Sequence, residues 1–130
     1  MDLIQLLDEA KRAMQNAYAP YSGFKVGAAL LDRNGNIHTG CNVENASYGL
    51  TICAERAAVA KAVSENVQEF AAIAIFADSD QVISPCGACR QVLAEFNPEM
   101  KVIMANLEGA TKETTLTELL PDPFRSERLQ

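Results

Sequence analysis

Residues 71–105 decide the fold, and they run AAIAIFADSDQVISPCGACRQVLAEFNPEMKVIMA. The apolar run 71–77 is followed by acidic and polar residues, which is typical of the end of a buried β-strand. Pro85 then precedes a predicted helix over 86–96, and a second apolar strand is predicted over 101–105. Strands that alternate with helices favour a layered α/β sheet.

The flanking segments extend this alternation. Apolar residues three or four apart over 2–17 predict an amphipathic helix with Asp2 as its N-cap. Asn34-Gly35 is a strong hairpin signal, so we expect two antiparallel strands on either side of it. Because no linker or internal repeat interrupts the pattern, we expect one domain over residues 1–130. The other predicted elements are strands over 24–31 and 37–43, a helix over 53–65, an edge strand over 112–115 and a helical turn over 116–120.

The composition favours a protein that acts on a small molecule. Its 130 residues are 48% hydrophobic and carry a net charge of −6, which is unsuited to a phosphate backbone, so we expect no nucleic-acid partner. No run approaches the ~18 apolar residues of a membrane span, and residues 1–5 lack the basic start of a signal peptide. We therefore expect a cytoplasmic protein with no membrane partner, whose four cysteines stay reduced and available to a metal.

Two cysteine motifs carry the chemistry, Cys53-Ala54-Glu55 and Pro85-Cys86-Gly87-Ala88-Cys89. Three thiols can hold Zn²⁺ and leave its fourth tetrahedral position open for water, as in a catalytic zinc site. A glutamate two residues after the first thiol is placed to move the protons of that water. We therefore predict one Zn²⁺ per subunit, held by Cys53, Cys86 and Cys89, with Glu55 as the catalytic residue.

The expected helix starts bear on the charge of this site. Pro85 suits the start of a helix, and Cys86 and Cys89 share one face of its first turn. Cys53 is expected to begin the other helix, and the partial positive charge of both N-termini favours thiolate over thiol. Three thiolates around Zn²⁺ still weaken it as a Lewis acid. Arg56 is placed to hydrogen-bond a thiolate and withdraw charge; the alternative is a solvated helix arginine.

Two other uses of the cysteines remain open at this point. One is a structural zinc site with Cys41 as the fourth ligand, and the other is a redox dithiol formed by the single CxxC motif. Cys41 lies on a predicted strand and is not paired with Cys53 as CxxC, so a small apolar role suits it better. Zinc content separates a metal site from a dithiol.

Four stretches resemble the small homotetrameric cytidine deaminases: 21–30 (YSGFKVGAAL), 40–46 (GCNVENA), 53–56 (CAER) and 84–91 (SPCGACRQ). The zinc motif by itself indicates only the wider deaminase superfamily. The other stretches indicate which class of substrate the protein binds. The resemblance implies a three-layer α/β/α sandwich with a mixed sheet of about five strands. It also implies a homotetramer with shared active sites.

By the same resemblance, one subunit supplies most of the substrate contacts. Asn42 and Glu44 are expected to bind the ribose 3′-hydroxyl, for which an amide and a carboxylate are chemically suited. Phe24 is expected to pack beside the nucleoside. The backbone at Ala54 and Ser84 is expected to contact the amino and N3–carbonyl edges of the base.

Neighbouring subunits are expected to complete each pocket. Ala46 and Tyr48 lie in the loop that does this in the family. Phe124 matches an aromatic residue that reaches over the pyrimidine, and an aromatic face suits a base. The alternative for Phe124 is an apolar anchor for the tail.

The implied reaction is the zinc-dependent hydrolytic deamination of cytidine and deoxycytidine to the uridines plus ammonia, in pyrimidine salvage. One carboxylate, Glu55, would act in turn as base and acid. The nearest alternative is a blasticidin S-type or other small-molecule aminopyrimidine deaminase, but Asn42, Glu44 and Phe124 favour a nucleoside. An RNA- or DNA-editing deaminase is disfavoured because the chain has no basic or aromatic stripe to hold a strand.

Overall fold

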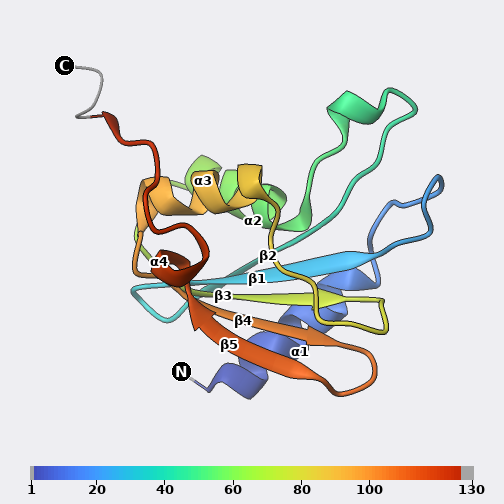
Figure 1. The fold of residues 1–130 in the computed structure, drawn as a ribbon, viewed down its shortest axis with the longest axis horizontal. Coiled ribbons are helices and arrows are strands. Elements are labelled where there is room, and N and C mark those ends of the chain that lie inside the picture. The colour runs from blue at the N-terminus through green and yellow to red at the C-terminus, as the bar shows by residue number, and fades with distance from the viewer. Residues whose placement is uncertain (1, 127–130) are drawn as a thin grey trace.

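A computed structural model describes residues 2–126, so residue 1 and residues 127–130 of the predicted domain lie outside the described part. Five strands form one sheet in the order β2-β1-β3-β4-β5 (Figure 1). The β3–β4 pair is parallel and the other neighbours are antiparallel, which confirms the predicted mixed sheet and hairpin. The strands are β1 (Val26–Asp32), β2 (Ile37–Cys41), β3 (Phe70–Ala77), β4 (Lys101–Asn106) and β5 (Thr111–Thr115).

Helices cover both faces of the sheet, which gives the three predicted layers. Figure 1 shows α2 and α3 together on one face and α1 on the other. A separate apolar cluster fills each interface, because both faces of the central strands carry apolar side chains. Within residues 2–126, no helix has the length and apolar character needed to cross a membrane. The helices are α1 (Leu3–Met14), α2 (Ala54–Ser64), α3 (Gly87–Phe96) and the short α4 (Leu116–Leu119).

Two glycines allow helices to approach the hairpin closely from opposite sides. A Cβ atom on Gly27 of β1 would lie 2.0 Å from the carbonyl oxygen of Ala10 in α1. A Cβ atom on Gly40 of β2 would lie 2.5 Å from the backbone nitrogen of Ala58 in α2. Both neighbours are backbone atoms and cannot rotate away. The close contact with Gly40 brings α2, which begins at the first cysteine motif, directly onto the sheet.

The ends of the elements depart from prediction for local reasons. The first helix stops at Met14, because the amides of residues 15–17 bond to carbonyls three residues back, in a tighter turn. The return strand ends at Cys41 and not at residue 43, because Val43 pairs with Tyr18 and Ile52. The third helix starts one residue later than predicted: α3 begins at Gly87, and Cys86 is its N-cap. Asp2 does cap α1, since its side chain accepts a hydrogen bond from the amide of Ile4 at 2.9 Å.

Candidate active site

Three cysteine sulfurs meet where the N-termini of α2 and α3 come together. Cys53 is the N-cap of α2, Cys86 is the N-cap of α3, and Cys89 lies in the first turn of α3. The sulfur of Cys53 makes no capping hydrogen bond to its own helix, so it is free to face the cluster. The three ligand atoms all lie within 4.8 Å of one another. Cys41 lies on β2 outside this cluster, so a four-cysteine site is not formed.

The chemistry of the three sulfurs fits a soft divalent metal ion. Cys89 is fully buried, and burial together with the charge of Glu55 raises the pKa of its thiol far above the usual range. Burial also acts to raise the pKa of Cys86, but hydrogen bonds from the Cys89 backbone and from the Cys89 and Cys53 side chains leave that pKa lowered. Three thiolates this close together, one of them fully buried, need a cation to offset their charge, and three thiolate ligands suit zinc.

Glu55 adjoins the cluster as the second residue of α2. Its side chain is held in the interior, with the residue only 5% exposed. Burial raises the pKa of Glu55, and its own backbone amide, the Cys89 thiol and the charge of Arg56 oppose the shift. A carboxyl group with a raised pKa can both accept and return a proton near neutral pH, which is what an acid–base residue must do.

Arg56 contacts the first cysteine, as the sequence predicted it could. Its Nη2 donates to Sγ of Cys53 at 3.8 Å and to the carbonyl oxygen of Thr51 at 3.4 Å. The hydrogen bond with Cys53 is the main cause of a raised pKa for Arg56. The Nε atom of the same guanidinium is buried and has no hydrogen-bond partner. Its positive charge therefore lies beside the sulfurs and partly offsets theirs.

A cavity of about 280 Å³ opens beside the cysteine cluster. It holds five of the eight predicted substrate-binding residues together with Glu55. Four further lining residues were not predicted: Val26, Thr51, Ile75 and Ile83. Thr51 and Ile83 lie close to the two cysteine motifs in the sequence, but their residue types do not indicate a role in ligand binding. The predicted residues that line the cavity are Phe24, Asn42, Glu44, Ala54 and Ser84.

Asn42 ties the wall of the cavity together. Its Nδ2 donates to the carbonyl oxygen of Phe24 at 2.8 Å, and its Oδ1 accepts from the amide of Val26 at 2.9 Å. These bonds fix the side-chain amide and hold the entry to β1 against the exit from β2. An amide nitrogen has two protons and an amide oxygen two lone pairs, so each atom keeps one site free for a ligand.

Glu44 lies at the mouth of the cavity. Its Oε1 accepts from the amides of Tyr21 at 3.0 Å and Ser22 at 3.1 Å, and its Oε2 accepts from the hydroxyl of Ser22. The Ser22 hydroxyl is the main cause of a lowered pKa for Glu44; the two amides add to it and desolvation opposes it. The carboxylate is therefore ionised at neutral pH, as an acceptor for a sugar hydroxyl should be.

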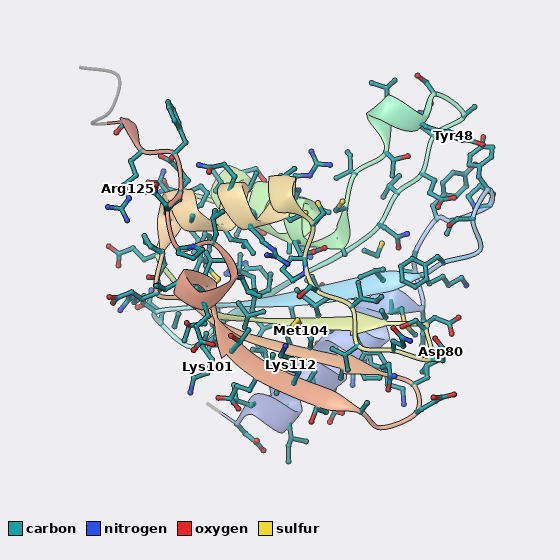
Figure 2. All side chains as sticks on the ribbon, viewed as in Figure 1. Tyr48, Asp80, Lys101, Met104, Lys112 and Arg125 are labelled. Carbon is teal, nitrogen blue, oxygen red and sulfur yellow. The ribbon has the colours of Figure 1, made fainter. Side chains whose placement is uncertain are left out.

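Three predicted substrate residues lie outside the cavity of their own chain. Ala46 is exposed, and Tyr48 is 75% exposed on a projecting loop (Figure 2). Phe124 is 57% exposed and is pinned to α3 by a reciprocal pair of bonds with Gln91, at 2.9 Å and 3.1 Å. None of the three lines this cavity, although Tyr48 lines an adjoining hollow together with Glu44 and Thr51.

Known proteins are similar to this chain over nearly its whole length. The family described as "Cytidine and deoxycytidylate deaminase zinc-binding region" matches residues 2–106. A cytidine deaminase of Sporosarcina psychrophila is 53% identical over 130 residues, covering 99% of this chain and 96% of that protein. The chain belongs to the cytidine deaminase family. Both cysteine motifs fall inside the matched region, so the match covers the whole cluster.

Two further matches concern the fold of the chain and the alternative function, blasticidin S deamination. The crystal structure of cytidine deaminase from Burkholderia pseudomallei has a TM-score of 0.92 and 49% identity, covering 95% of this chain and 100% of that one. The α/β/α fold of the family is thus the fold of this chain. Blasticidin-S deaminase of Bacillus cereus is 33% identical over 104 residues, or 74% of each protein. That weaker and shorter match favours the cytidine deaminases over the alternative.

Proposed function

We propose that this protein catalyses the hydrolytic deamination of cytidine and deoxycytidine to uridine and deoxyuridine plus ammonia, in pyrimidine salvage. One observation carries the proposal: Glu55 and two of the three clustered cysteines line the same cavity as Phe24 and Asn42. A proton carrier, a metal site and a pocket for a small ring are what this reaction requires. The cytidine deaminases to which the chain is similar support the choice of substrate.

The metal would be held by Cys53, Cys86 and Cys89, one zinc ion in each subunit. When bound, zinc supplies a Lewis acid that lowers the pKa of water toward neutrality. The protein's own part is to limit the negative charge of three thiolates. Positive charge near the sulfurs offsets part of the thiolate charge. It comes from the N-termini of α2 and α3 and from the guanidinium of Arg56.

Glu55 would carry the protons of the reaction. It accepts a proton from the water that attacks C4 and passes it to N3, which makes C4 more electrophilic. It then takes the remaining proton from the hydroxyl group added to C4 and gives it to the departing amine, so that the C4–N bond breaks, ammonia leaves, the C4 carbonyl forms and the carboxylate returns to its starting state. The buried position beside the cysteines supports this role, because it keeps bulk water from competing for the proton.

The nucleoside would be bound by the walls of the cavity. Phe24 packs beside the base, and the backbone at Ala54 and Ser84 contacts the amino and N3–carbonyl edges. Asn42 and Glu44 bind the ribose 3′-hydroxyl with the hydrogen-bonding sites that their protein partners leave free. A pocket shaped for one ring would also disfavour adenosine.

The active protein would be a cytoplasmic homotetramer of one-domain chains, residues 1–130, with shared active sites. Large apolar side chains are exposed around the loop that carries Tyr48, which supports burial against other copies. Ala46, Tyr48 and Phe124 would then reach the cavity of a neighbouring chain. The acidic net charge supports a nucleoside and not a nucleic acid as the partner. The exposed apolar residues of this surface are Tyr18, Tyr21, Val43, Tyr48, Leu50 and Ile52.

A direct assay tests the function. The purified protein is incubated separately with cytidine, deoxycytidine and blasticidin S, and loss of the 4-amino group is followed by ultraviolet absorbance. We expect turnover of both cytosine nucleosides and one zinc ion per chain by metal analysis. Turnover of blasticidin S alone would assign the chain to the alternative, and turnover of none would overturn deamination of these substrates.

A further inference from the structure

The carboxylate of Glu44 has almost no hydrogen-bonding capacity left. An ionised carboxylate offers about four acceptor sites, two on each oxygen. Both sites of Oε1 are used by the amides of Tyr21 and Ser22, and one site of Oε2 is used by the Ser22 hydroxyl. One acceptor site on Oε2 therefore remains for a ligand, and its direction depends on where Ser22 holds that oxygen.

The hydroxyl of Ser22 also fixes a second wall of the cavity. While its proton goes to Glu44, its oxygen accepts a hydrogen bond from the amide of Phe24 at 2.9 Å. The intervening residue, Gly23, has a positive φ of 70°, which allows the tight turn that brings both partners to one hydroxyl. A single side chain thus links the carboxylate at the mouth of the cavity with the aromatic residue on its wall.

We propose that Ser22 is a positioning residue for ribose recognition: its hydroxyl aims the free acceptor site of Glu44 at the ribose 3′-hydroxyl. The proposal rests on the proposed function. Ser22 is an exposed loop residue with no part in either apolar core, so its removal should leave the fold intact. Its effect should appear only in substrates that carry the hydroxyl that Glu44 binds.

The kinetic test compares Ser22→Ala and Ser22→Thr on cytidine and on 3′-deoxycytidine. With cytidine, the alanine variant should lose about five- to tenfold in kcat/KM, mainly through KM, as expected for losing one bond to a charged acceptor. With 3′-deoxycytidine, its kcat/KM should stay within about twofold of wild type. Threonine keeps the hydroxyl and should restore cytidine turnover to within about twofold. The matched control is Ser64→Ala, which also removes an exposed hydroxyl, bonded to a backbone carbonyl at the far end of α2.

A second measurement does not depend on turnover. The pKa of Glu44 is followed by carbon-13 NMR of labelled carboxyl groups, with Glu44→Gln to assign the signal. Loss of the Ser22 hydroxyl should raise the pKa of Glu44 toward its ordinary value, and Ser22→Thr should keep it low.

The outcomes separate the two proposals. Wild-type protein that turns over neither nucleoside overturns the proposed function and the ribose assignment with it. Wild-type turnover combined with equal losses on both substrates in Ser22→Ala, or with an unchanged pKa of Glu44, overturns the role of Ser22 alone. Loss on cytidine only, with restoration by threonine and a raised pKa of Glu44 in the alanine variant, supports it.

Discussion

The Nη2 atom of Arg56 lies 3.8 Å from Sγ of Cys53, while the Nε atom of the same guanidinium is buried and unpaired. A partly buried cation without a carboxylate hydrogen-bond partner is stabilised when other negative charge lies beside it. Three clustered thiolates supply that charge. Arg56 and the cysteines therefore stabilise one another, and the pair explains how an all-sulfur site can hold a metal that remains a useful Lewis acid.

Arg56→Gln should weaken both the site and the reaction. Outer-shell partners of metal ligands typically contribute about 10- to 100-fold to metal affinity or activity, and we expect a loss in that range. Zinc retention during dialysis against a chelator and kcat for cytidine are the two measurements. Arg12→Gln, which removes an exposed arginine paired with Glu9, serves as the control. If Arg56→Gln retains zinc and turns over cytidine as the wild type does, the arginine is a solvated helix residue with no role in the metal site.

The contact between Gly27 and α1 predicts a large effect from a small substitution. Gly27→Ala would bring a methyl group to within 2.0 Å of the Ala10 carbonyl oxygen, so α1 must move off the sheet. We expect a loss of about 1–3 kcal/mol or more in the free energy of unfolding. Chemical denaturation measures it, and Ser64→Ala, at an exposed position near the end of α2, should leave stability nearly unchanged. Equal stabilities for the two variants would contradict the packing.

Asp32 gives the hairpin a predictable response to acid. Burial raises the pKa of Asp32, but bonds from His38 at 2.9 Å and from the amides of Asn36 and Asn34 outweigh it, and the pKa is lowered. A lowered pKa in the folded state means that the charged form stabilises the fold above the unfolded-state pKa. This contribution is lost as the pH falls through the folded-state pKa.

Asp32→Asn keeps the shape of the side chain and removes its charge. We expect the variant to be less stable than wild type at neutral pH by about 1 kcal/mol or more, in line with hydrogen bonds to a charged group. The difference should shrink as the pH falls through the lowered pKa of folded Asp32, because the wild-type side chain is then protonated too. Denaturation curves across this range give the difference, and a gap that stays constant with pH would count against the account.

The predicted sharing of active sites is tested at Tyr48. Sedimentation equilibrium should give the mass of four chains. Tyr48→Ala should reduce kcat/KM for cytidine although its side chain lies outside the cavity of its own chain. A fully active monomer would remove Tyr48 and Phe124 from the site.

Local signals in the sequence predicted the elements and the metal cluster well. Apolar periodicity, the Asp2 cap and the Asn34-Gly35 turn are short-range features, and the elements they predict are present. Cysteine spacing and helix starts likewise predicted that three sulfurs would meet. The end of the return strand was not predictable in this way. Val43 pairs with Tyr18 and Ile52, and this pairing depends on tertiary contacts and not on local sequence.

The walls of the pocket were predictable only in part, for a similar reason. Phe24 and Asn42 were proposed from resemblance to a family, and both line the cavity. Thr51 and Ile83 line the same cavity, but a threonine or isoleucine in a loop has many ordinary uses. Ser22 looks like a common turn residue until the side chain of Glu44 is seen to fold back onto it.

The most direct test of the central claim is Glu55→Gln, assayed for bound zinc and for cytidine turnover in the same preparation. The account predicts one zinc ion per chain, as in wild type, with kcat reduced by about 100- to 10,000-fold because the proton carrier is gone. Glu65→Gln, at the opposite end of the same helix, should retain wild-type zinc and kcat. Near-normal turnover by Glu55→Gln with zinc in place would contradict the account.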